Sequence, residues 1–111
     1  MIKIYYTPEA KSDLAGVEES IRVELANPTA AKSTVSGITK RIRNLERFSE
    51  MGAPLFSVTG IDSAYRFLVC GHYLAFYRIE GNDIYIDRVL YGRRDYMSIL
   101  FGDLPQDEEE T

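Results

Sequence analysis

The sequence predicts a two-layer α+β domain in which a helical hairpin packs on an antiparallel sheet. Apolar residues recur at steps of three and four through residues 8–48, which is the period of amphipathic helices. Three β-prone segments follow within residues 65–91, separated by short turns that contain glycine. Helices segregated from an antiparallel meander are typical of α+β architectures.

Size and composition indicate one compact domain. A chain of 111 residues with 45% apolar content can bury a core without disulfides. The single cysteine, Cys70, lies in an apolar segment, where we expect a buried thiol rather than a nucleophile. With one histidine in the chain, we expect no metal and no cofactor. No run approaches the roughly 20 apolar residues that span a bilayer, so we expect a cytoplasmic protein without a membrane partner.

The net charge of −4 is unevenly distributed. Residues 102–111 hold five acids and no base, whereas residues 1–101 hold 13 bases and 12 acids. We therefore expect a single domain over residues 1–101 and a solvated acidic tail over residues 102–111. An alternative is that the tail folds back over a basic site.

The first half of the chain predicts a strand over residues 2–6 and two helices. Thr7-Pro8 supplies an N-cap and a proline at the first helical position, and this helix should run to about Ala26. Asn27-Pro28 ends it and begins the second helix, so the two should form an antiparallel hairpin. The apolar stripes expected to face the core are Ala10, Leu14, Val17, Ile21 and Leu25 in the first helix, and Ala31, Val35, Ile38, Ile42, Leu45 and Phe48 in the second.

The outer face of the second helix is basic. Lys40, Arg43 and Arg47 follow one another at three and four residue spacing, opposite the apolar stripe. Such a face is either simply solvated or binds a polyanion or an acidic partner. Gly37 is unfavourable inside a helix, so we expect it to mark a close approach to a neighbouring element.

The second half predicts a loop over residues 49–62, with a short edge strand near residues 56–59, followed by strands at 65–70, 73–79 and 84–91. In the last strand, alternation should place Arg88 and Leu90 with Ile84 and Ile86, and Asp87 with Val89 on the opposite face. A strand with two such faces is usually central and covered on both sides, so both charges need partners or must reach a groove.

The exit of the last strand is a predicted anion site. Gly92 allows a turn, and Arg93 and Arg94 follow as adjacent positive charges. Asp95 should cap a short C-terminal helix, whose expected inward residues are Met97, Leu100 and Phe101. With the hairpin on one sheet face, we expect the other face to remain partly open.

The order and spacing of these segments resemble the RelE/ParE superfamily of toxins from bacterial type II toxin-antitoxin modules. The likeness covers nearly the whole chain. Its features are the segments TPEAKSDL, ANPTAAK, RFSEMGAPL, YRFLVCGHYLAFYRI and YIDRVLYGRRDYMSIL. The resemblance implies a toxin neutralised by a cognate antitoxin, whose disordered segment folds across it.

Two functions occur in this superfamily. RelE-like members cleave mRNA in the ribosomal A site, whereas ParE-like members poison DNA gyrase. We expect the first, a metal-independent endoribonuclease whose partner is mRNA on the ribosome. The alternatives are a gyrase inhibitor without catalytic activity, which binds through the last helix and tail, and a degraded toxin that only binds its antitoxin.

The resemblance assigns candidate site residues by position. The expected catalytic residues are Arg66, Arg94, Tyr91 and Tyr96, and the expected RNA-binding residues are Arg93, Lys40, Arg43, Arg47, Arg88 and His72. Structural roles are also open: Arg66 as a bridge between polar groups of the sheet or a partner of Asp87, the tyrosines as packing residues, and His72 as part of a turn.

One departure from the family pattern concerns the middle strand. Many members place an arginine after the tyrosine there, whereas Tyr73 is followed by Leu74 in this chain. The expected site therefore lacks one cation unless Arg78 or Arg88 supplies it.

Overall fold

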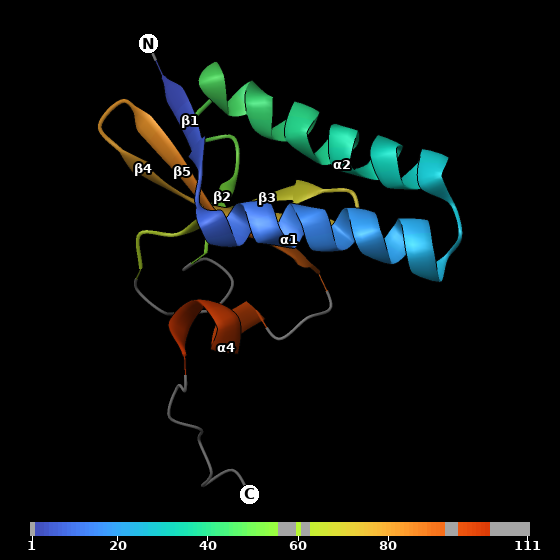
Figure 1. The fold of residues 1–111 in the computed structure, drawn as a ribbon. Helices are drawn as coiled ribbons and strands as arrows, with labels where there is room; N and C mark the ends of the chain where they lie inside the picture. Colours follow the sequence, from blue (N-terminus) through green and yellow to red (C-terminus); the bar gives the residue numbers. More distant parts are fainter. Residues whose placement is uncertain (1, 56–59, 61–62, 93–95, 103–111) are drawn as a thin grey trace, which may run out of the picture.

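The computed structural model of the chain describes residues 2–55, 60, 63–92 and 96–102, with only the backbone of residues 96–98. The predicted α+β class is confirmed, with two helices over one face of a mostly antiparallel five-stranded sheet (Figure 1). The strands are β1 (Lys3–Tyr6), β2 (Ala53–Pro54), β3 (Arg66–Cys70), β4 (Tyr73–Glu80) and β5 (Asp83–Tyr91). The helices are α1 (Pro8–Glu19), α2 (Pro28–Arg43) and α4 (Tyr96–Phe101).

The sheet has the order β1-β5-β4-β3-β2, so β5 is interior, as the sequence predicts. The N-terminal strand β1 pairs with β5 in parallel, with Lys3 opposite Asp83, and the other neighbours are antiparallel. The strand expected near residues 56–59 lies outside the described residues, and β2 comes earlier in the loop.

Both helices begin at the predicted caps. The Thr7 side chain accepts a hydrogen bond from the backbone of Ala10, and that of Asn27 accepts one from Ala30. The first helix differs from expectation at its end, because α1 passes into a π-helical segment over Ser20–Glu24. Helix α2 continues into a 3₁₀ turn over Asn44–Glu46.

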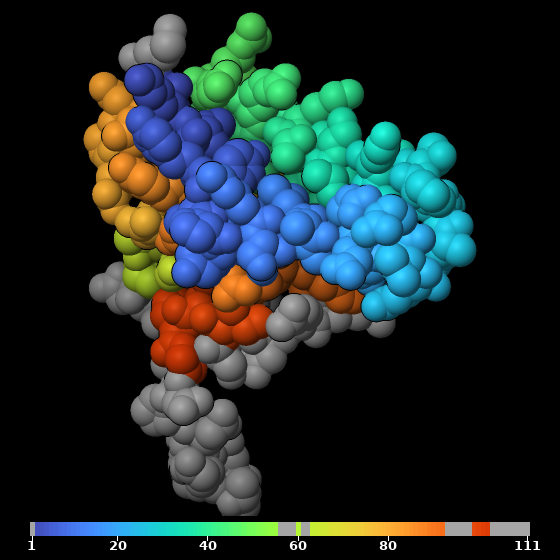
Figure 2. All heavy atoms as spheres, viewed as in Figure 1, coloured from blue at the N-terminus to red at the C-terminus, as the bar shows by residue number. Residues whose placement is uncertain are grey.

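The main core lies between the helical hairpin and the sheet. It combines helix residues such as Ala10, Ile38 and Ile42 with strand residues such as Tyr77 and Ile84. The hairpin extends beyond the sheet at the end where α1 passes into α2 (Figures 1 and 2). Among the described residues, none of the helices has the length and apolarity needed to span a membrane.

Two residues of the predicted apolar stripes are exposed. Leu25 is 70% exposed at the end of the hairpin, and Phe48 is 63% exposed just after the 3₁₀ turn. Each lies past a departure from α-helical geometry, where a period of 3.6 residues no longer fixes the direction of the side chain.

The expected alternation along β5 is wrong beyond Ile86. Tyr77 pairs with Ile86 and Phe76 pairs with Arg88, so Asp87 is an extra residue in a β-bulge. After the bulge, Val89 packs in the core beneath the helices. Leu90 instead packs on the opposite face with Leu55 and Phe76.

This opposite face is less open than the sequence suggested. A second apolar cluster of Leu55, Phe76 and Leu90 is packed there against Ile99, Leu100 and Phe101 of α4. Tyr65 and Phe101 make an edge-to-face contact at 5.8 Å between ring centroids. Helix α4 therefore covers part of the surface that was expected to hold a ligand.

Candidate functional site

Arg66 fixes a loop instead of standing free on a sheet face. It is paired in register with Tyr77, whose ring lies in the core beneath the helices. One Nη atom of Arg66 donates to the carbonyl of Gly52 at 2.6 Å and to that of Glu50 at 3.1 Å. The Nε atom of Arg66 is buried without a hydrogen-bond partner. Of the roles left open for Arg66, this geometry favours bridging polar groups.

The same loop is held by Tyr77. Its hydroxyl donates to the carbonyl of Ser49 at 2.9 Å and accepts from the backbone of Gly52 at 3.0 Å. A methyl group on Gly52 would lie 2.4 Å from the carbonyl oxygen of Phe67, so only glycine fits this close approach. Together Arg66 and Tyr77 tie residues 49–52 to the sheet.

Arg88 is engaged by a carboxylate of this chain. Its Nε and one Nη each lie 2.8 Å from an oxygen of Asp13 in α1, and Asp13 also accepts from the backbone of Val89 at 2.9 Å. The hydrogen bond to Asp13 is the main cause that raises the pKa of Arg88. Exposure of 26% for Arg88 and 12% for Asp13 places the pair partly out of water. The arrangement favours a link between α1 and β5 over contact with RNA.

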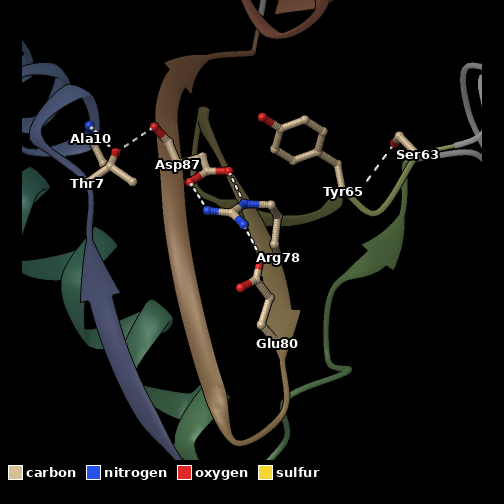
Figure 3. A network of polar contacts seen from close by, with 7 residues as sticks. All are labelled: Thr7, Ala10, Ser63, Tyr65, Arg78, Glu80 and Asp87. Carbon is tan, nitrogen blue, oxygen red and sulfur yellow. Dashed lines mark hydrogen bonds and ion pairs between the residues drawn. The ribbon is translucent and has the colours of Figure 1, made fainter.

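Arg78 pairs with Asp87, the extra residue of the β-bulge in β5. Its Nε lies 2.5 Å from one carboxylate oxygen of Asp87 and an Nη lies 3.2 Å from the other, and Arg78 also contacts Glu80 (Figure 3). Its guanidinium stacks 5.1 Å over the ring of Tyr85. Neither Arg78 nor Arg88 is therefore a free substitute for the missing cation.

Leu74, which stands where many relatives have that cation, packs against the cluster beneath α4. An arginine there would place a charge beside Phe76 and Leu90. The apolar side chain thus agrees with the local packing.

Tyr91 is one wall of an open groove. It is 41% exposed and meets Tyr73 edge-to-face at 5.6 Å between ring centroids. Burial, followed by the neighbouring Tyr91, raises the pKa of Tyr73. Tyr73 therefore keeps its phenol proton at neutral pH, and both rings are available for packing and for hydrogen bonds.

Two grooves open where the hairpin overhangs the sheet. Groove A has a volume of about 440 Å³ and is lined by Ser12, Asp13, Gly16, Val17, Ser20, Tyr73, Val89, Leu90 and Tyr91. Groove B has a volume of about 320 Å³ and is lined by Ser33, Thr34, Gly37, Ile38, Arg41, Cys70, Gly71, His72 and Tyr73. Tyr73 lines both grooves.

The glycines of these grooves have a role that the sequence did not reveal. A methyl group on Gly16 or Gly37 would meet no atom within 4 Å, so the close approach expected at Gly37 is wrong. Instead the missing side chains leave room beside Tyr73. A glycine inside a helix indicates either a close contact with a neighbouring element or an open groove, and the sequence alone does not distinguish the two.

The remaining candidate residues fall into three groups. His72 is exposed in the turn between β3 and β4, and Lys40, Arg43 and Arg47 are exposed along and just after α2. Arg93 and Arg94 lie outside the described residues, and the side chain of Tyr96 does so as well. Within the described part of the chain, no group of three His, Cys, Asp or Glu side chains could hold a metal ion.

Comparison with known proteins agrees with this fold. Residues 4–96 match a family described as the ParE toxin of type II toxin-antitoxin systems, parDE. A solved structure described as the chromosomal ParDE TA system from P. aeruginosa has a TM-score of 0.70 and 25% sequence identity. That match covers 82% of this chain and 96% of the other. A search of curated proteins gave no match.

The fold and these matches confirm the predicted class, a RelE/ParE superfamily toxin of a type II toxin-antitoxin system. Within that class, the chain belongs to the ParE toxin family. A protein of this kind has an antitoxin as a partner. The family match favours the alternative that the sequence left open, a gyrase-directed toxin, over the ribonuclease.

Proposed function

We propose that this protein is a toxin that binds DNA gyrase and traps it on DNA, without catalytic activity of its own. The observation that carries the proposal is the match of residues 4–96 to the ParE toxin family, whose members poison gyrase. The proposal replaces the ribosome-dependent endoribonuclease that the RelE/ParE resemblance and the arginine pair after the last strand suggested. Gyrase acts in the cytoplasm, so the toxin acts there too.

The side-chain geometry supports a binding role. A metal-independent ribonuclease needs cations and proton-transfer groups that converge on one phosphate. Arg66 instead bonds to carbonyls of its own loop, and Arg88 bonds to Asp13. Tyr91 lies beside Tyr73 in groove A, on the face that carries the helices. Arg66 and Arg88 are thus engaged in internal contacts, and Tyr91 lines a groove in which neither of these arginines takes part.

The gyrase contact is expected at α4 and the residues after it. Ile99, Leu100 and Phe101 anchor α4 to the sheet, so the helix can act as a rigid base for a segment that contacts another protein. The tail adds five acids beyond Phe101, which would favour a basic surface such as the DNA-binding region of gyrase.

Purified gyrase with supercoiled plasmid provides the test. We expect linear DNA to appear after detergent and protease treatment, because a trapped cleavage complex releases broken DNA. A truncation after Gly102 should lose this effect while keeping the circular dichroism of the full chain. Primer extension on mRNA from cells that express the toxin should show no new codon-linked 5′ ends.

The opposite results would reject the proposal. New 5′ ends without gyrase-linked breaks would restore the ribonuclease. No growth arrest together with intact antitoxin binding would indicate a degraded toxin.

The antitoxin is expected to fill grooves A and B. A helix or extended peptide with apolar residues would pack on Tyr73 and Tyr91, and its acidic residues would face Arg41 in groove B and the arginine pair after β5. The overhang of the hairpin supports this position, because a bound peptide would contact both helices and the sheet together.

A further inference from the structure

A row of exposed bases on α2 is not used by any contact described above. Lys40 and Arg43 lie three residues apart in α2, where Arg43 borders a hollow that Ile4 and Tyr6 of β1 also line, and Arg47 follows directly after the 3₁₀ turn. All three are exposed, and the opposite side of the helix buries Ile38 and Ile42. We call Lys40, Arg43 and Arg47 the basic row.

No ion pair of the basic row is found in the part of the chain that the structure describes. Among the described residues, ion pairs within 4 Å involve Arg22, Arg78 and Arg88 but no member of the row. Arg41, their neighbour, is instead turned to the carbonyl of Val69 at 3.0 Å. The row is therefore a part of α2 and of the turn after it on which positive charge stays available to a partner, as it does at the exposed Lys32.

The two helices of the hairpin carry opposite net charges, and this difference would orient an anionic partner. Residues 28–47 contain five bases and one acid, Glu46, whereas residues 8–25 contain two bases and five acids. A polyanion would be attracted by α2 and repelled by α1, although the whole chain carries −4. In Figure 1, α2 forms one margin of the molecule, where a large partner could lie along it.

We propose that the basic row binds phosphates of the duplex DNA that gyrase holds, which rests on the proposed gyrase function. The row extends roughly 12 Å along the axis, at 1.5 to 2.0 Å per residue. That length matches about three steps of one DNA strand at 3.4 Å each. A line of cations suits a duplex backbone, whereas single strands are bound on platforms of several aromatic rings; beside the row, the exposed ring is that of Phe48. The contact should be independent of sequence.

Fluorescence anisotropy with a random 20-base-pair duplex tests the contact directly. Three phosphate contacts predict a slope of log K against log salt of about −2.7, or roughly a 40-fold loss of affinity from 50 to 200 mM. The triple variant Lys40→Gln, Arg43→Gln, Arg47→Gln should bring the slope close to zero. The control variant Lys3→Gln, Lys11→Gln, Arg22→Gln removes the same charge from exposed positions elsewhere, and it should keep most of the slope.

Several results would overturn the inference. Equal slopes for the wild type and the row variant would show that the row does not touch DNA. Equal losses of DNA affinity in both triple variants would show that the effect depends only on net charge. Stronger binding of a single strand, or row-dependent binding of poly-glutamate without DNA binding, would assign the row to another class of partner.

A gyrase experiment separates this inference from the proposed function. In a pull-down without DNA, the row variant should bind gyrase as the wild type does, yet yield several-fold fewer cleavage complexes on plasmid. If the wild type fails to bind gyrase while the row still determines the anisotropy slope, the gyrase proposal fails and the DNA contact stands. If the row variant traps gyrase as well as the wild type, the DNA contact has no place in the trapped complex.

Discussion

Tyr77 shows how one buried polar atom can organise a loop. Its ring is fully buried, and its hydroxyl bonds to Ser49 and Gly52. The Tyr77→Phe variant would leave both backbone groups without a partner in the interior. We expect it to lower the free energy of unfolding by roughly 1–3 kcal/mol, measured by urea denaturation.

A surface tyrosine provides the control for Tyr77. Tyr5 is 42% exposed and stacks on Tyr85 at 5.3 Å between ring centroids. Tyr5→Phe should change the free energy of unfolding by less than about 0.5 kcal/mol. Equal effects of the two substitutions would mean that the loop contacts are not important for stability.

Cys70 gives a prediction about pH. Burial raises the pKa of its thiol from 9.0 to about 11, and the charge of Arg41 acts in the opposite direction. The folded chain therefore keeps the proton between pH 9 and 11, where the unfolded chain loses it. Stability should fall as the pH rises through this window.

Urea denaturation at a series of alkaline pH values measures this fall. Cys70→Ala should reduce the pH dependence, while the fall caused by tyrosines with raised pKa values, such as Tyr6, remains. At pH 8, iodoacetamide should react roughly 100-fold more slowly with the folded protein than with a free thiol. Rapid alkylation of the folded chain would contradict the assignment of Cys70 as a buried thiol.

At the scale of elements, the two helix caps are chemically similar but differ in their hydrogen-bond partners. Thr7 accepts from Ala10 and also donates to the carbonyl of Asp87 at 3.0 Å, so it joins α1 to the bulge in β5 (Figure 3). Asn27 caps α2 at an exposed position with a bond to Ala30. Thr7→Ala should cost about 2 kcal/mol or slightly more, and Asn27→Ala about 0.5–1 kcal/mol.

Thermal and urea unfolding of the two cap variants would test this order. Thr7→Ser keeps both hydrogen bonds and should recover most of the stability lost by Thr7→Ala. A greater cost for Asn27→Ala than for Thr7→Ala would show that the link between Thr7 and Asp87 contributes little.

The caps also explain which elements were predictable. Thr7-Pro8 and Asn27-Pro28 are local signals, and both helices begin where these signals place them. The bulge at Asp87 has no comparable signal, because an extra residue in β5 depends on how β4 pairs with it. Because of that one residue, Leu90 lies on the face beneath α4 and Val89 joins Ile84 and Ile86 in the main core, the reverse of the expected placement.

The candidate site was predictable as a set of residue types but not as an arrangement. The sequence marked Arg88 as a charge that needs a partner and left open that Arg66 bridges polar groups of the sheet. Arg88 is bound by the carboxylate of Asp13, and Arg66 donates to the carbonyls of residues 50 and 52; these partners depend on tertiary contacts. Grooves A and B could not be inferred, since Tyr73 gains its position only when the hairpin overhangs the sheet.

At the scale of the whole molecule, the helical hairpin offers two separate binding surfaces. The grooves beneath it hold Tyr73 and small helix residues, whereas α2 and the turn after it carry the basic row. An antitoxin in the grooves would not need to cover the basic row. Neutralisation would then act by blocking the approach of gyrase or by holding the hairpin and sheet in one arrangement.

A substitution at Gly37 should block the antitoxin contact in groove B without disturbing the core. It lines groove B, and a side chain there would extend into open space. Gly37→Leu should keep the fold, with stability raised by up to about 1 kcal/mol because glycine is unfavourable inside a helix. The added side chain should occupy groove B and weaken antitoxin binding at least 10-fold in titration calorimetry.

Growth assays extend this test to the cell. Cells that express the Gly37→Leu toxin with its antitoxin should stop growing, because gyrase inhibition persists while neutralisation is lost. Gly37→Ala gains the same helix stability with little bulk in the groove, so its antitoxin affinity should stay near that of the wild type. Full protection of the leucine variant by the antitoxin would mean that the peptide lies outside groove B, and the equivalent substitution at Gly16 would then test groove A.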